Sequence, residues 1–137
     1  MLPPGVKTLK AIRRQRDPVT RVHEAKRLLE YLLDAMTPGL TDGRGREAFL
    51  GDMVRAQEGC FSNVRDVMFA IGVRNRLDHP SVREEPPKAD EIERAGWHLV
   101  RAVEEVLPHA PGEVAREAGY RRAGLVGRVL GRVIGRG

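Results

Sequence analysis

Cysteine, aromatic residues and long apolar runs are all scarce in this chain. Cys60 is the only cysteine among 137 residues, which excludes an internal disulfide framework. Aromatic residues make up 4% of the chain, so we expect an aliphatic core. No run approaches the roughly 18 apolar residues of a membrane span, and no signal-peptide pattern follows Met1. We therefore expect a cytoplasmic protein, in which Cys60 is a small, partly buried residue and not a nucleophile.

The net charge of +5 is distributed unevenly along the chain. Residues 1–27 contain eight Lys or Arg and two Asp or Glu, residues 28–110 contain ten and fifteen, and residues 111–137 contain six and two. If nucleic acid binds, most non-specific attraction to phosphate should come from the two basic ends. The alternative is that these ends pair with acidic faces of this chain or of a neighbouring chain.

Apolar residues recur at intervals of three and four along four stretches, which predicts four amphipathic helices in one domain. Asp17 and Pro18 form an N-cap and a first-turn proline, so the first helix should start at residue 18 and end near Thr37. Such a set of helices favours an all-α helical domain over residues 17–109.

The other three helices are predicted at residues 46–58, 63–78 and 89–107. The helix over 46–58 should bury its apolar residues, including Phe49. Ser62 is the expected N-cap of the next helix.

Both ends of the chain differ in composition from this bundle. Residues 1–16 are a basic N-terminal arm, either mobile or docked through one helical turn. Residues 110–137 are a basic Gly/Arg/aliphatic tail, and residues 125–136 repeat the pattern aliphatic-aliphatic-Gly-Arg. As a helix this repeat would be basic and amphipathic. We rank docking on a partner or a second copy first, contact with a membrane surface second, and disorder third.

One cluster of side chains, at the predicted end of the 63–78 helix, has the chemistry of a reactive site. Arg74 shares a helical face with the apolar residues before it, so its stem lies on the core while its guanidinium reaches the surface. Pro80 ends the helix, so His79 should lie at the last turn, where its ring can turn toward Arg74. Asn75 and Arg76 lie between them.

These residue types suit a phosphodiester substrate. An arginine binds phosphate oxygens bidentately and stabilises the charge that develops in the transition state. A histidine, with a reference pKa of about 6.5, can take a proton from a ribose 2′-hydroxyl or give one to the leaving oxygen. Neither a metal nor a cofactor is required. The alternative is a solvated helix end, where basic residues complement the helix dipole and His79 caps carbonyl groups.

The remaining histidines and the tryptophan give weaker signals. His23 begins an HExxH pattern, but Arg27 occupies the position of the second histidine, so no metal site is predicted. His98 and His109 have no partners at ligand spacing. Trp97 could stack on a base, but packing beside the core stripe is the ordinary interpretation.

Arg74, Asn75, three further residues and then His79-Pro80, at the end of an apolar-striped helix, resemble the R-x4-H motif of the HEPN superfamily. HEPN domains are four- to five-helix up-and-down bundles, so the resemblance implies an all-α, four-helix up-and-down bundle over residues 17–109. Many are metal-independent endoribonucleases of toxin–antitoxin, abortive-infection and CRISPR-linked systems. Others have lost catalysis and bind RNA or proteins.

The resemblance implies that Arg74, Asn75 and His79 are catalytic, and Arg76 is a further candidate for binding RNA phosphate. It also implies cleavage by 2′-hydroxyl attack at the interface of a homodimer where two motifs meet, with an antitoxin or other protein as a further partner. A dimer would supply both the base and the acid that the reaction needs. The alternative is a catalytically inactive module that binds RNA, a nucleotide or a protein partner in a defence or regulatory system.

Overall fold

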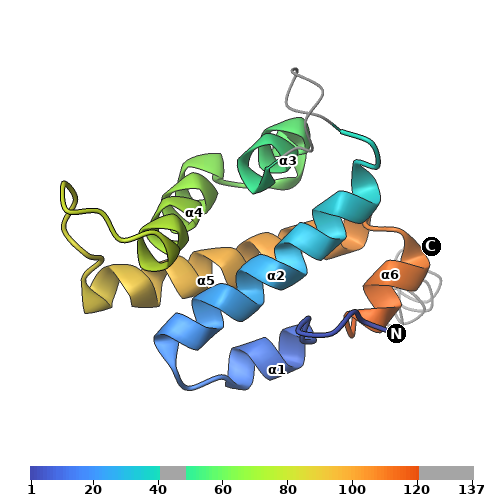
Figure 1. The fold of residues 1–137 in the computed structure, drawn as a ribbon. Coiled ribbons are helices and arrows are strands. Elements are labelled where there is room, and N and C mark those ends of the chain that lie inside the picture. The colour runs from blue at the N-terminus through green and yellow to red at the C-terminus, as the bar shows by residue number, and fades with distance from the viewer. Residues whose placement is uncertain (41–48, 121–137) are drawn as a thin grey trace, which may run out of the picture.

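The computed structural model describes residues 1–40 and 49–120, which form a helical fold without strands in these ranges (Figure 1). The α-helices are α1 (Leu9–Arg14), α2 (Pro18–Met36), α3 (Leu50–Ala56), α4 (Val64–Asp78), α5 (Ala89–Val106) and α6 (Gly112–Glu117). Two one-turn 3-10 helices, Glu58–Cys60 and Leu107–His109, follow α3 and α5. The predicted all-α class is confirmed for this part of the chain.

Three long helices organise the structure, with α2 and α5 in the most extensive contact (Figure 1). Arg21 near the start of α2 contacts Glu93 near the start of α5, so these two helices run in the same direction. His23 near the start of α2 contacts Asp78 at the end of α4, so α4 runs the opposite way. The order is therefore up, down, up. The second helix predicted by the pattern is the short α3, which crosses between α2 and α4.

The core is aliphatic, as the low aromatic content predicts. Its largest fully buried side chains come mainly from α2 and α5, and they include Leu28, Leu29, Leu32, Leu33, Leu99, Val103 and Val106. The core also reaches beyond these helices: Ile12 of α1 and Ala115 of α6 are fully buried in it. The N-terminal segment is therefore docked on the core. The helical turn that was the docked alternative for residues 1–16 is the six-residue helix α1.

Two details of the helix starts differ from the prediction. The N-cap of α4 is Asn63, whose Oδ1 accepts from the N–H of Asp66 at 3.2 Å, and not Ser62. Ser62 instead donates its backbone N–H to Glu105 of α5 at 3.2 Å. Phe49 is not buried: as the N-cap of α3 it lies outside the helical face, and it is 69% exposed.

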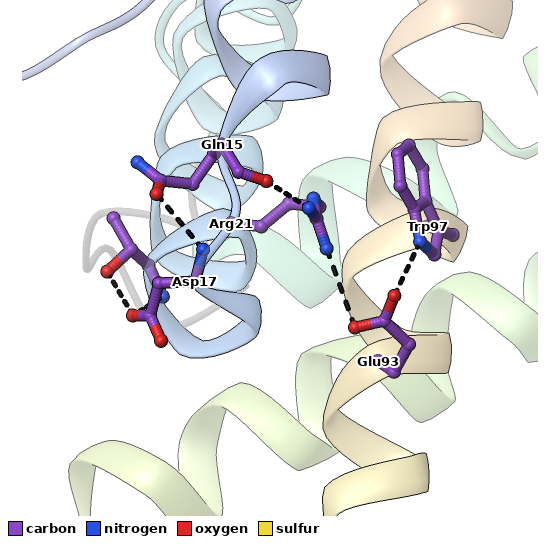
Figure 2. A network of polar contacts seen from close by, with 6 residues as sticks. Gln15, Asp17, Arg21, Glu93 and Trp97 are labelled. Carbon is purple, nitrogen blue, oxygen red and sulfur yellow. Dashed lines mark hydrogen bonds and ion pairs between the residues drawn. The ribbon is translucent and has the colours of Figure 1, made fainter.

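A buried arginine joins α1 and α2 to α5 (Figure 2). Arg21 is 6% exposed, and its guanidinium lies 4.4 Å from the centre of the Trp97 ring and 3.5 Å from the carboxylate of Glu93. It also donates to the backbone carbonyl of Gln15, which follows α1. A Cβ at Gly96 would lie 3.3 Å from Cδ of Arg21, so the glycine leaves room for the arginine stem. Trp97 thus packs on Arg21, and base stacking is not needed to explain it.

Asp17 caps α2 as predicted, and this cap should make stability depend on acid pH. Hydrogen bonds from the hydroxyl and the backbone N–H of Thr20 hold the pKa of Asp17 below its ordinary value of 3.8. The carboxylate therefore stabilises the fold above that value, and the contribution is lost as the pH falls through the lower folded-state pKa. We expect Asp17→Ala to destabilise the protein at neutral pH. The difference from wild type, measured by urea unfolding, should shrink in acid, and a difference independent of pH would contradict this role.

No helix in residues 1–40 and 49–120 is long and apolar enough to cross a membrane. The repeat over 125–136, for which a basic amphipathic helix is predicted, lies outside the described residues.

Candidate functional site

The end of α4 carries the predicted site, and Arg74 is held there by its own helix. Its Nη2 lies 2.7 Å from Oδ2 of Asp78, one turn later, and its Nη1 donates to Oδ1 of Asn75 at 3.3 Å. The side chain is 23% exposed, and its Nε is buried without a hydrogen-bond partner among the described residues. Asp78 therefore neutralises one side of the Arg74 guanidinium.

Asp78 also contacts a second helix. Its Oδ1 lies 3.6 Å from Nε2 of His23 on α2, so the carboxylate lies between Arg74 and His23. The contacts of Asp78 with Arg74 and His23 were not predicted from the sequence. The spacing of four between Arg74 and Asp78 could have indicated their contact, whereas the approach of His23 depends on the packing of α2 against α4.

His79 lies at the end of α4, as the following proline predicts. It is the C-cap residue, and its backbone N–H donates to the carbonyl of Asn75 at 2.8 Å. Its exposed side chain lines a hollow of about 490 Å³ whose wall also contains Phe69, Gly72 and Asn75. We call this space the His79 hollow. An additional Cβ at Gly72 would meet no atom within 4 Å, so the hollow is open there.

Arg74 lines a different space, a groove of about 480 Å³ between α2, α3 and α4. We call it the Arg74 groove. Asn75 lines both the groove and the His79 hollow. Residues five apart on an α-helix differ by about 140° in direction, which separates Arg74 from His79. Within residues 1–40 and 49–120, the His79 ring and the Arg74 side chain are not in contact. The predicted approach of the two side chains is therefore not present in this monomer.

Arg76 is also partly neutralised. Its Nη2 lies 3.7 Å from Oε2 of Glu91 on α5, and its side chain borders the His79 hollow together with Glu84. A phosphate at this position would compete with Glu91 for the guanidinium. Arg76 is thus placed to assist binding at the hollow, but it is less available than an unpaired arginine.

The remaining groups considered from the sequence, Cys60, Trp97 and His98, have neighbours within the fold that account for them. Burial raises the pKa of the Cys60 thiol, with a smaller contribution from Glu105, so the thiol form is favoured. Trp97 donates its ring N–H to Glu93 at 3.1 Å. Nδ1 of His98 lies 3.8 Å from Oδ2 of Asp66, and the His98 ring lies edge-on to the Phe69 ring. Among residues 1–40 and 49–120 no three His, Cys, Asp or Glu side chains are grouped so that they could hold a metal ion.

Comparisons of the chain with protein-family models, with curated proteins and with solved structures give no match. The HEPN interpretation therefore depends on Arg74, Asn75 and His79 and on the helix that carries them.

Proposed function

We propose that this protein is a cytoplasmic, metal-independent endoribonuclease of toxin or defence type, built on a HEPN-like helical bundle. The observation that supports it best is the exposed imidazole of His79 in an open hollow, with Asn75 connecting that hollow to the groove of Arg74. An RNA strand that crosses α4 at Asn75 would meet an imidazole on one side and a guanidinium on the other.

In the proposed reaction, a neutral imidazole accepts the proton of a ribose 2′-hydroxyl. The 2′-oxygen attacks the adjacent phosphorus, the bond from phosphorus to the 5′-oxygen breaks, and an acid supplies the proton to the leaving oxygen. The products are a 2′,3′-cyclic phosphate and a 5′-hydroxyl. Arg74 would stabilise the charge on the phosphoryl oxygens, and the amide of Asn75 can donate to the same group.

A homodimer would supply the second proton-transfer group. Each chain places one imidazole, that of His79, in the hollow, whereas the reaction uses both a base and an acid. Two copies that meet at the ends of α4 would contribute one His79 each. The rate should then show a bell-shaped dependence on pH, because one imidazole must be neutral and the other protonated.

The direct test is incubation of the purified full-length protein with total RNA in excess EDTA, followed by analysis of the new ends. Fragments with 2′,3′-cyclic phosphate and 5′-hydroxyl ends would support the proposal. Fragments with 5′-phosphate ends, or cleavage that EDTA abolishes, would contradict it, because either result requires a different mechanism.

A second candidate is a catalytically inactive module that binds RNA, a nucleotide or a protein partner. The ion pair of 2.7 Å between Arg74 and Asp78 favours it, because a neutralised guanidinium contributes less to catalysis. The acidic middle of the chain, with fifteen Asp or Glu against ten Lys or Arg in residues 28–110, also provides little general attraction for RNA.

Asp78→Asn should strengthen RNA binding if Arg74 contacts phosphate under either candidate. Releasing one partly exposed ion pair corresponds to about 0.2–1 kcal/mol, or a gain in affinity of up to about fivefold. Asp66→Asn is the matched control, because it removes the same charge from the first turn of α4, beside His98. Binding would be measured by fluorescence anisotropy with a labelled oligonucleotide. Equal gains for both variants would indicate an effect of net charge alone and would exclude Arg74 as the contact.

A further inference from the structure

The Arg74 groove has an exposed aromatic side chain at its edge. Phe49, which is 69% exposed, lines the groove at the start of α3, opposite the side chains that α4 contributes. Its backbone is fixed, because its N–H donates to the carboxylate of Asp52 at 3.1 Å. Within residues 1–40 and 49–120 this large aromatic ring is not part of the core.

The groove also contains a cation that has no partner among the described residues. Lys26 is paired with Glu30 at 3.0 Å, and Arg74 is paired with Asp78. Arg55, on α3, is exposed, and no ion pair or hydrogen bond of its side chain is recorded within residues 1–40 and 49–120. Glu30 and Asp52 line the same groove. Glu30 is paired with Lys26, and Asp52 accepts from the backbone of Phe49, so Arg55 and Arg74 are the cations that an anion in the groove would contact.

Proteins that hold single-stranded nucleic acid combine a positively charged groove with aromatic side chains. The ring stacks on a base of any identity, while the guanidinium binds the backbone phosphate. The groove also borders the proposed cleavage position, because Asn75 lines both the groove and the His79 hollow. A strand cleaved at His79 would therefore pass its neighbouring nucleotide into the groove.

We propose that the Arg74 groove is a binding subsite for a nucleotide adjacent to the cleaved bond. Arg55 holds the phosphate of this nucleotide and Phe49 stacks on its base, while Arg74 contacts the phosphate of the cleaved bond. This inference rests on the proposed ribonuclease function and extends it, since it assigns residues of α3 to substrate binding. Because stacking does not read base edges, the subsite favours single-stranded over paired RNA and has little preference for base identity.

The test uses the full-length protein and a single-stranded 2′-O-methyl oligoribonucleotide, which lacks the attacking hydroxyl and cannot be cleaved by this route. Phe49→Ala should weaken binding by about 5- to 150-fold, the range measured for loss of one stacked base. Arg55→Ala should also weaken binding, and its effect should diminish at high salt. Val82→Ala is the control, because Val82 is fully exposed on the connector between α4 and α5 and lines neither the groove nor the hollow.

A second variant keeps the test informative if Phe49→Ala misfolds. Phe49→Trp should retain binding, and its emission should be quenched by the oligonucleotide in a chain that also carries Trp97→Phe. Unchanged binding by a folded Phe49→Ala protein would overturn the subsite. So would a change in sedimentation without a change in binding, since Phe49 would then face a second copy.

The experiments can reject the proposed subsite and the proposed nuclease activity independently of each other. Binding that depends on Phe49 in a protein that never cleaves RNA would support the subsite and remove the proposed catalysis. Cleavage of RNA with the same KM in Phe49→Ala and in wild type would support the nuclease and overturn the subsite.

Discussion

Replacing His79 with alanine should lower the rate of RNA cleavage by about 10²–10⁴, which is the usual contribution of a general acid or base. His79 is exposed at the C-cap of α4, and its ring lines an open hollow, so the substitution removes a reactive group without opening the core. The free energy of unfolding should therefore stay close to that of wild type. The loss should appear in kcat, because the imidazole acts on the transition state and contributes little to binding.

The comparison with Arg74→Ala distinguishes two roles at one site. That variant should lose a similar factor in rate, but it should also bind RNA more weakly, because the guanidinium contacts phosphate before the reaction. His109→Ala is the matched control, since His109 is also an exposed histidine and lies in the 3-10 helix after α5. The proposed catalytic role fails if His79→Ala and His109→Ala cleave RNA at the same rate as wild type.

Leu32→Ala should reduce the free energy of unfolding by about 2–5 kcal/mol. Leu32 is fully buried on α2, in the core shared with α5, and truncation would leave a cavity that helices on both sides cannot fill. Domains of this kind are stable by only about 5–15 kcal/mol, so one such change removes a large fraction of the total.

Urea unfolding followed by circular dichroism would measure the effect. Val82→Ala serves as the control: it also truncates an aliphatic side chain, but Val82 is fully exposed, and its unfolding free energy should change by no more than about 0.5 kcal/mol. A small effect at Leu32 would show that α2 and α5 do not share the core described above.

Local sequence signals predicted the local features of this fold. The pair Asp17-Pro18 identified the start of α2, and Pro80 identified the end of α4, because capping and proline geometry act within a few residues. Asn63 and Ser62 are both good N-cap residues, so the sequence could not decide between them. Phe49 was assigned to a core because apolar periodicity does not reveal where a helix begins.

The geometry of the site depends on contacts between residues that are far apart in the sequence, and local sequence patterns do not predict such contacts. His23 reaches Asp78 only because α2 packs against α4, and Arg55 and Phe49 border the Arg74 groove only because α3 crosses beside it. The motif of Arg74 and His79 could be read from spacing. That spacing also indicates that the two side chains point in different directions, since residues five apart on a helix differ by about 140°. The walls of the groove and the hollow could not be read from the sequence, because they depend on which faces of α4 the other helices cover.

The packing of Arg21 on Gly96 also constrains how this sequence can evolve. The arginine stem occupies the space beside the glycine, so the effect of a mutation at position 96 depends on the residue at position 21. A side chain at 96 requires the Arg21 stem to shift by a few tenths of an ångström, and this shift is not needed once residue 21 is shorter. The effects of the two substitutions are therefore expected to be non-additive.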